Sequence, residues 1–367
     1  MPELPRVAGA HLVGSINQPT AESTFRVVSE HLGTDLARIP DGEVGERFHW
    51  MLFQGAAFEA TAGLSRVPIE PIMHAGFDLR PFVLDGSVPA DDIRFASLGY
   101  AAAAIASYSD FVALREAGVI EAGTRFQVSL PSALAPITTY AAPQVRAALL
   151  PAYTDALVRE LDAIADAIPA ADLAVQLDLA TEFAYMEAVN LGAGVAEPFF
   201  LTDDERSDGG AGLIHGIARI VAPIAARVPA GAELGFHLCY GDVAEKHFTE
   251  PHDAANLTAV ANALADAVDR PIQWVHLPVP IERDDDGYFA PLASLRLGDA
   301  TRLYLGLVHH EDGVEGALRR IAAARPALTA SGIEVFGVGT ECGFGRGPAE
   351  RTAPLLDLHH AVIAAAN

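Results

Sequence analysis

One histidine and two cysteines carry the side chains best suited to metal chemistry in this chain of 367 residues. His237 and Cys239 lie two positions apart in an apolar run typical of a buried strand, so both side chains point to the same side. The other cysteine, Cys342, follows a second such run. Imidazole and thiolate groups are preferred zinc ligands, so we predict that these three residues bind Zn²⁺. The alternative is a hydrogen-bonded core histidine beside a small apolar cysteine.

A fourth zinc ligand is expected from the neighbouring strand. His276 lies in the run Trp-Val-His-Leu-Pro at residues 274–278, the next strand-like run after that of His237. We therefore predict His276 as the fourth ligand. A buried histidine bonded to a backbone carbonyl is the alternative.

The elements that must position these residues alternate along the chain. Short apolar runs alternate with alanine- and leucine-rich runs, which is typical of a parallel α/β protein. Eight strands at this length predict a single (β/α)₈ TIM barrel, one domain over residues 1–367, with an insertion after strand 2 at about 44–125. A doubly wound open sheet is the alternative. The predicted strands are His11–Ile16, Leu36–Glu43, Phe126–Pro131, Leu173–Ala180, Glu233–Tyr240, Ile272–Val279, Leu303–His309 and Glu334–Thr340.

Further polar residues lie at the carboxyl ends of these strands, where a barrel holds its active site. They are Asp41, Glu43, Ser129, Asp178 and His309. Stability alone would not require groups that are costly to bury at these positions. We predict that these residues bind the substrate or act on it.

The charge balance limits the classes of partner. The chain has 24 basic and 48 acidic residues, a formal net charge of −24, which repels phosphate backbones and anionic lipid headgroups. The first residues lack the pattern of a signal peptide, and the most apolar stretch, residues 96–108, is too short to span a bilayer. We expect a cytoplasmic protein with small-molecule partners and no nucleic acid or membrane partner. Self-association into a homo-oligomer is left open.

Several of these segments resemble the catalytic barrel of cobalamin-independent methionine synthase, a family of zinc enzymes that activate thiols. Residues 236–240 (Phe-His-Leu-Cys-Tyr) and 339–343 (Gly-Thr-Glu-Cys-Gly) resemble its zinc-binding segments. Residues 40–43 (Pro-Asp-Gly-Glu) and 175–178 (Val-Gln-Leu-Asp) resemble its segments that bind the amino group of homocysteine. The resemblance implies that Glu43 and Asp178 hold a substrate ammonium group and that His309 protonates the leaving group. An ion pair with Arg38 or Arg47 is the alternative for the two carboxylates.

The sequence also departs from this family. The family has a glutamate ligand where this chain has His276, and its Asp-Glu-Pro segment is replaced by Asp-Leu-Ala at residues 178–180. Residues 129–132 (Ser-Leu-Pro-Ser) lack the family's aromatic residue on the folate side. These differences argue against a folate donor. A neutral histidine ligand would also make the zinc a better electrophile and its bound thiolate a weaker nucleophile.

The function expected from these observations is zinc-dependent transfer of an alkyl or methyl group from a non-folate donor to a small thiol. Two alternatives are kept. A lyase or hydrolase on the same barrel would place water or a substrate oxygen on the zinc. A non-catalytic barrel would bind a ligand through its strand-end carboxylates without a metal.

Overall fold

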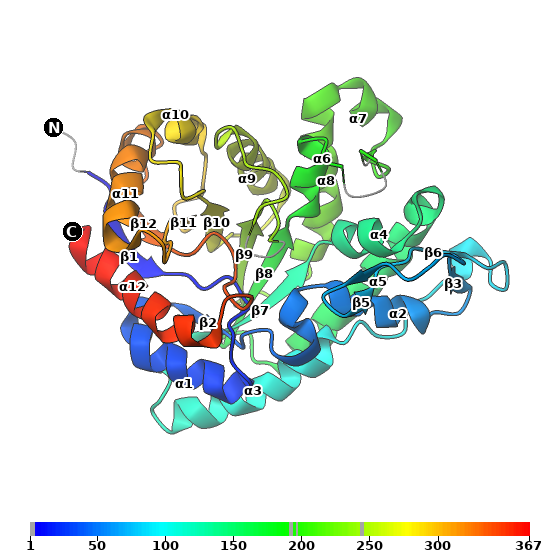
Figure 1. Ribbon diagram of the computed structural model, residues 1–367, viewed down its shortest axis with the longest axis horizontal. Coiled ribbons are helices and arrows are strands. Elements are labelled where there is room, and N and C mark those ends of the chain that lie inside the picture. Colours follow the sequence, from blue (N-terminus) through cyan, green and yellow to red (C-terminus); the bar gives the residue numbers. More distant parts are fainter. Residues whose placement is uncertain (1–3, 191–193, 196, 243–245) are drawn as a thin grey trace.

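A curled parallel sheet forms the centre of the computed structural model, which describes residues 4–190, 194–195, 197–242 and 246–367 (Figure 1). Its eight strands are hydrogen-bonded in the order β1-β12-β11-β10-β9-β8-β7-β2. Along the chain, helices separate the successive strands of this sheet, so the alternation of strand and helix predicted from the sequence is present. The strands are β1 (Arg6–Ala10), β2 (Arg38–Pro40), β7 (Arg125–Pro131), β8 (Leu173–Leu179), β9 (Glu233–Leu238), β10 (Trp274–Pro278), β11 (Arg302–Gly306) and β12 (Val335–Val338).

The two edge strands of this sheet approach each other. Isolated parallel bridges join Ala10 to Leu36 and Ser15 to Gly42, just before and just after β2. These bridges bring the segments of β1 and β2 together, so the sheet curls back toward its own edge. The α/β class is thus observed, and complete closure into a barrel stays a prediction.

Helices cover the outer face of the sheet (Figure 1). Neighbouring helices pack against each other around it: α12 against α1, α1 against α3, α3 against α5 and α8 against α9. The helices are α1 (Ala21–Leu32), α2 (Gly55–Glu59), α3 (Tyr100–Glu116), α4 (Leu134–Tyr140), α5 (Arg146–Ala167), α6 (Thr181–Met186), α7 (Asp203–Ser207), α8 (Gly209–Ala225), α9 (Ala255–Ala267), α10 (Asp286–Phe289), α11 (Gly313–Ala330) and α12 (Thr352–Ala365).

Helix α1 shows how local sequence creates these elements. Thr20 accepts a hydrogen bond from the backbone of Ser23, and the Ser23 hydroxyl bonds back to Thr20, so the first turn is capped. Phe25 and Val28 lie on the face that is buried against the sheet. Phe25 packs edge-on against Phe126 of β7, which joins the helix to the sheet.

The segment between β2 and β7 holds more than one crossover helix. It contains α2, the antiparallel pair β3 (Leu64–Arg66) with β6 (Phe82–Leu84), and the pair β4 (Met73–His74) with β5 (Phe77–Asp78). Helix α3 then packs between α1 and α5. The range predicted as an insertion therefore includes a helix of the outer layer. No helix in the described part of the chain is long and apolar enough to cross a membrane.

The first strand lies earlier than its predicted position at residues 11–16. Strand β1 ends at Ala10, and the apolar residues that follow are buried without joining the ladder as a strand. Backbone hydrogen bonds remain at the two ends of this segment, from His11 to Val338 and from Ile16 to Gly42. Side-chain amides serve the carbonyls between them: Gln127 donates to Leu12 and Val13, and Gln176 donates to Val13. The apolar pattern reports burial, which a loop can achieve when side chains satisfy its backbone.

Candidate metal centre and substrate cavity

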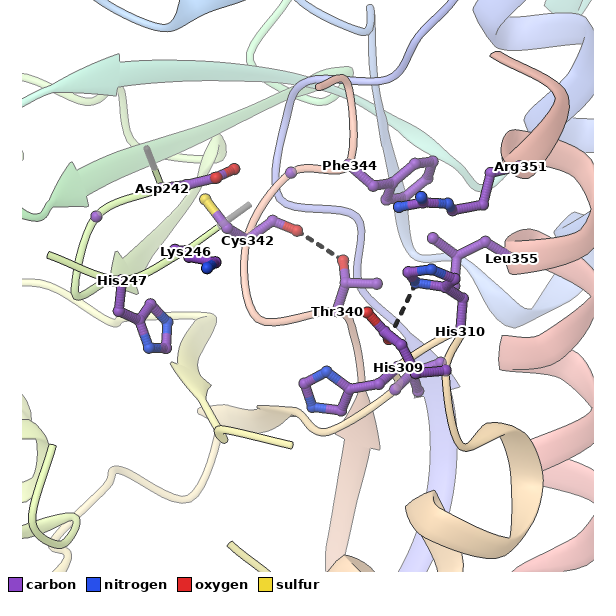
Figure 2. Close-up of a pocket in the computed structure, with 14 residues that line it drawn as sticks. Asp242, Lys246, His247, His309, His310, Thr340, Cys342, Phe344, Arg351 and Leu355 are labelled. Carbon is purple, nitrogen blue, oxygen red and sulfur yellow. Dashed lines mark hydrogen bonds and ion pairs between the residues drawn. The ribbon is translucent and has the colours of Figure 1, made fainter. Parts of the chain in front are cut away.

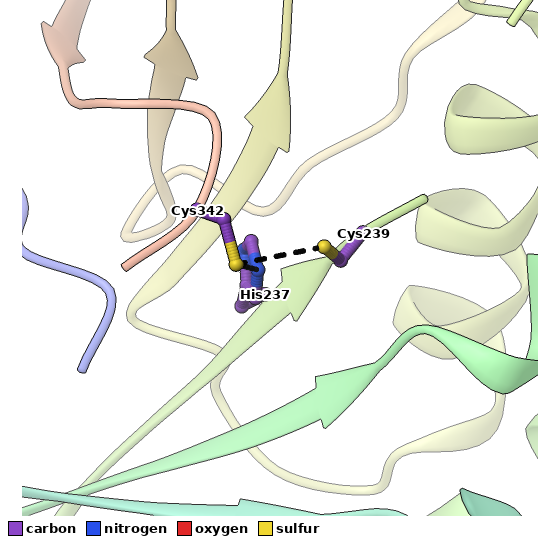
Figure 3. A group of neighbouring side chains, drawn as sticks. All are labelled: His237, Cys239 and Cys342. Atoms are coloured by element: carbon purple, nitrogen blue, oxygen red, sulfur yellow. Dashed lines mark hydrogen bonds between the residues drawn. The ribbon is translucent and has the colours of Figure 1, made fainter. Parts of the chain in front are cut away.

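The structure brings His237, Cys239 and Cys342 together (Figure 3). Their three ligand atoms all lie within 4.8 Å of one another. The two sulfur atoms are 3.8 Å apart, and Nε2 of His237 is 3.7 Å from Sγ of Cys342. Tetrahedral zinc with bonds of about 2.3 Å to sulfur and about 2.0 Å to nitrogen separates two sulfurs by about 3.8 Å, and sulfur from nitrogen by about 3.5 Å. The donor set therefore fits one zinc ion.

Each of the three residues is positioned at the carboxyl end of a strand. His237 belongs to β9, and Cys239 lies just beyond β9, where its backbone amide donates to the carbonyl of Leu179 in β8. Cys342 follows β12 in a turn where the Thr340 hydroxyl donates to its carbonyl. Because these are parallel strands of one sheet, their carboxyl ends converge, and residues distant in sequence meet.

The thiols depend on each other electrostatically. The neighbouring thiol of Cys239, together with burial, raises the pKa of the Cys342 thiol well above its usual value. Two adjacent thiolates repel each other, so a cation between them would favour the doubly ionised form. Burial also lowers the pKa of His237, which keeps its imidazole neutral and able to bind a metal.

His276, which the sequence analysis predicts as the fourth zinc ligand, is not among the three residues whose ligand atoms converge. It pairs directly with His237 across the β9–β10 ladder, and the Nδ1 atoms of the two rings lie 2.8 Å apart. It therefore contacts the ring nitrogen of His237 that faces away from the thiols. The other ring nitrogen of His276, Nε2, packs against Gly339. If residue 339 had a side chain, its Cβ atom would lie only 3.0 Å from this nitrogen. The buried ring is thus held between β9 and β12.

The three residues line a cavity of about 1320 Å³ that also contains Glu43 and Asp178. Five of the residues predicted from the sequence therefore share one space. Within the described residues, neither Glu43 nor Asp178 forms an ion pair. The two arginines considered as alternative partners pair elsewhere: Arg47 with Asp41, and Arg38 with Glu233.

Burial controls the charge of both carboxyl groups. It raises the pKa of Glu43 to about 7, and it raises the pKa of Asp178 well above its usual value, with the neighbouring Glu43 adding to the shift. Trp50 Nε1 donates to Asp178 at 3.2 Å, and Gln176 donates to its other oxygen at 2.9 Å. Glu43 has a φ of 50°, a left-handed conformation that follows Gly42. A cationic group in the cavity would favour ionisation of both.

Asp41 and Ser129 lie outside the set of residues that line this cavity. Arg47 donates to both oxygens of Asp41, at 3.2 and 2.7 Å, and Asp41 accepts from the backbone of Glu43. The Ser129 hydroxyl donates to the carbonyl of Val13. The structure thus gives both residues contacts that shape the surrounding loops.

His309 lines a smaller adjoining pocket of about 100 Å³, which shares Cys342 with the main cavity (Figure 2). Its Nε2 is 2.9 Å from the carbonyl of Val279, and its Nδ1 is 4.0 Å from a carboxylate oxygen of Glu341. Burial, with a contribution from Arg320, lowers the pKa of His309 to about 4, so the imidazole is neutral at pH 7.

The sequence assigns no role to four further residues of this region, Glu341, His247, Arg346 and Trp50, although Glu341 lies in the segment at 339–343 that resembles a zinc-binding one. Glu341 lies between His309 and His247, whose Nε2 is 3.8 Å from it, and burial raises the pKa of Glu341 well above its usual value. Arg346 and Trp50 line the main cavity. Glu341 precedes Cys342 and Arg346 follows it by four residues, which is a local signal, whereas nothing near Trp50 in sequence indicates its place.

Comparisons with known proteins support the fold. No family model matches the chain, and no curated protein matches it. A Listeria monocytogenes protein provisionally named a vitamin-B12-independent methionine synthase is similar in structure, with a TM-score of 0.56, 15% identity and 98% of each chain covered. A B12-independent methionine synthase from Shewanella sp. W3-18-1, solved with selenomethionine, has a TM-score of 0.59 and 15% identity, covering 99% of this chain and 98% of its own. The chain shares their fold, in agreement with the fold implied by the sequence resemblance.

Proposed function

We propose that this protein is a zinc-dependent enzyme that transfers an alkyl or methyl group to a small thiol. The observation that carries the proposal is the convergence of His237, Cys239 and Cys342 on one point of a cavity that also holds two carboxyl groups. The structural neighbours add support, because two proteins of the same fold are named as methionine synthases.

The chain supplies three ligands, so a fourth zinc position is left for the substrate. Zinc held by His237, Cys239 and Cys342 would lower the pKa of a substrate thiol bound at that position, so that thiolate would be available at neutral pH. The two thiolates would balance the +2 charge of the ion, so the zinc site as a whole would be neutral. A cavity of about 1320 Å³ next to this position leaves space for both a thiol and an alkyl donor.

Glu43 and Asp178 are proposed to hold the ammonium group of the substrate. Their side chains line the cavity without a cationic partner among the ion pairs of the described residues. An ammonium group would supply the missing charge and form charge-assisted hydrogen bonds. The bonds from Trp50 and Gln176 fix the orientation of Asp178 for this contact.

His309 and Glu341 are proposed to transfer the proton to the leaving group. The neutral imidazole places its Nε2 against a backbone carbonyl, so Nδ1 faces Glu341. Since burial favours the protonated form of Glu341, this carboxyl group is a proton source beside His309. We propose a non-folate donor, on the sequence departures described above, and a single domain over residues 1–367.

Metal content is the direct test. We expect purified wild-type protein to hold about one zinc ion per chain by elemental analysis, and Cys239→Ser to lose it because a hydroxyl is a much weaker zinc ligand. His360→Gln serves as a control, since His360 is exposed and pairs with Asp35 away from the cavity. Stoichiometric zinc in Cys239→Ser would show that the ligand set is wrong, and absence of metal uptake by the wild type would favour the non-catalytic barrel.

A zinc lyase or hydrolase is the second candidate, favoured by the same open fourth position, because water can take it. The two functions differ in their response to thiols. In cobalt-substituted protein, a transferase should show an absorption change that saturates with thiol concentration. No change at saturating thiol would contradict the transferase and favour the second candidate.

A further inference from the structure

The segment between β2 and β7 forms one wall of the main cavity, and this wall is apolar. Trp50, Met51, Ile69, Ile72 and Leu79 are among its lining residues. Within the described part of this segment, the lining includes two histidines at positions 49 and 74, but no aspartate, glutamate, lysine or arginine. In a chain with a net charge of −24, a wall of this kind is suited to an uncharged group.

The hairpin formed by β4 and β5 keeps its charged side chains out of this wall. Arg80 and Asp78 pair with each other, with 2.6 Å between Nη2 and Oδ2, and neither residue lines the cavity. The backbone amide of Leu79 donates to the carbonyl of Ile72 at 2.8 Å, which holds these two apolar residues together across the hairpin. The hairpin thus offers the cavity its apolar side chains alone.

These apolar side chains are exposed, although they lie beside the candidate metal centre. Ile69 and Ile72 are 48% and 47% exposed, and Val195, which lines the same cavity from another segment, is 58% exposed. The other large apolar side chains that are exposed in the described chain are Leu4, Met73 and Ile105. Exposed apolar residues that gather at one opening are typical of a binding site.

The cavity is larger than a small thiol requires. Its volume of about 1320 Å³ exceeds the roughly 300–1,000 Å³ of a pocket for a drug-sized ligand. A thiol on the zinc would occupy the end at Cys239 and Cys342, which leaves the apolar wall for the second substrate. The arginines of the lining are already engaged or balanced, since Arg346 pairs with Asp242 and Arg146 donates to two backbone carbonyls. The exposed Arg206 shares the lining with the exposed Glu197.

We propose that the apolar wall binds an uncharged, apolar body of the alkyl donor. This inference rests on the proposed function and adds a chemical class for the second substrate. The body of the donor would pack against Ile69, Ile72 and Leu79, with the transferable group directed toward the thiol. A small molecule is the occupant we infer, because Ile72 lines a cavity that is continuous with the metal centre, whereas its exposed neighbour Met73 does not.

A matched pair of fluorescent probes tests the chemistry of this wall. N-phenyl-1-naphthylamine is uncharged, and 8-anilinonaphthalene-1-sulfonate adds a sulfonate to the same rings. Both fluoresce more strongly in apolar surroundings. We expect the zinc-loaded protein to bind the uncharged probe at one saturable site, at least about 10-fold more tightly than the sulfonate, because the wall buries apolar surface and the chain repels anions. Equal or weaker binding of the uncharged probe would overturn the proposal.

Substitutions on adjacent residues locate the site. Ile72→Asp should weaken binding of the uncharged probe at least about 10-fold, and Ile72→Ala should weaken it less, since it removes apolar contact without adding a charge. Met73→Asp is the matched control: Met73 is also exposed but does not line the cavity, so the affinity should change less than about threefold. Equal losses in Ile72→Asp and Met73→Asp would indicate that a protein partner or a second copy covers the hairpin, which would overturn the proposal.

Simultaneous binding of probe and thiol separates this inference from the proposed function. In cobalt-substituted protein, saturation with 2-mercaptoethanol should leave the affinity for the uncharged probe within about threefold, because donor and thiol must occupy the cavity together. Mutual exclusion would overturn the assignment of the wall to the donor while the proposed function stands. A protein whose cobalt absorption does not respond to thiols would overturn the proposed function, and with it the donor role, even if the probe binds.

Discussion

The ring nitrogens of His237 and His276 explain how a second histidine can support a metal site without binding the ion. Nε2 of His237 faces Cys342, so a metal bound there leaves the proton on Nδ1. That N–H would donate to Nδ1 of His276, 2.8 Å away. His276 is therefore a positioning residue for His237, which fixes its tautomer and ring orientation.

At this scale we predict that His276→Leu lowers zinc affinity by about 10- to 100-fold, because it removes the acceptor for the His237 N–H. His276→Asn should restore most of the affinity, since its side-chain oxygen lies near the place of Nδ1. Affinity is measured by competition with a chelator, and the cobalt absorption spectrum reports the ligand geometry.

The control for this prediction is His359→Leu, which removes another fully buried histidine, one that bonds to a backbone carbonyl of its own helix. If His276→Leu and His359→Leu had the same effect on zinc affinity, loss of packing would be the cause and the positioning role would be contradicted.

At the scale of elements, the turn after β12 decides where Cys342 lies. Gly343 packs directly against the segment after β1: a Cβ atom at this position would lie 2.4 Å from Oγ and 2.8 Å from the backbone nitrogen of Ser15. A side chain would force the two segments apart. The close approach of these two loops thus holds Cys342 beside the end of β9.

We predict that Gly343→Ala lowers the free energy of unfolding by about 1–3 kcal/mol and weakens zinc binding, because the turn must move away from Ser15. Urea denaturation and chelator competition measure the two effects. Gly123→Ala is the matched control, since no atom lies within 4 Å of its added Cβ and its φ is not positive. Wild-type zinc affinity in Gly343→Ala would show that the turn does not position the ligand.

At the scale of the whole molecule, the two ends of the described chain meet in one sheet. Strand β1 pairs with β12, helix α1 packs against α12, and Asn367 exchanges hydrogen bonds with the backbone of Val7. The most distant parts of the sequence therefore stabilise each other. This arrangement gives a physical basis for the single domain that was proposed from the sequence.

We predict one cooperative thermal transition, because neither half of the sheet can be completed without strands from the other. Differential scanning calorimetry should give a calorimetric enthalpy equal to the van't Hoff enthalpy, on the order of 250 kcal/mol near 60 °C. Two separate transitions in the metal-loaded protein would contradict a single domain.

The sequence by itself determined the alternation of strands and helices and the candidate zinc ligands His237, Cys239 and Cys342. Periodicity and residue type are local properties, and they are readable without the fold. The predicted position of the first strand is wrong because apolar spacing reports burial, and residues 11–16 are buried as a loop whose carbonyls at Leu12 and Val13 accept from side-chain amides.

Only the tertiary structure decided which of the candidates meet. Cys239 and Cys342 are 103 residues apart, and the curl of the parallel sheet brings their sulfurs to 3.8 Å. The register of β9 and β10 places His276 beside Nδ1 of His237, the nitrogen that faces away from the thiols, and loop packing places Trp50 in the cavity. These positions depend on contacts between distant segments, and such contacts leave no local pattern in the sequence.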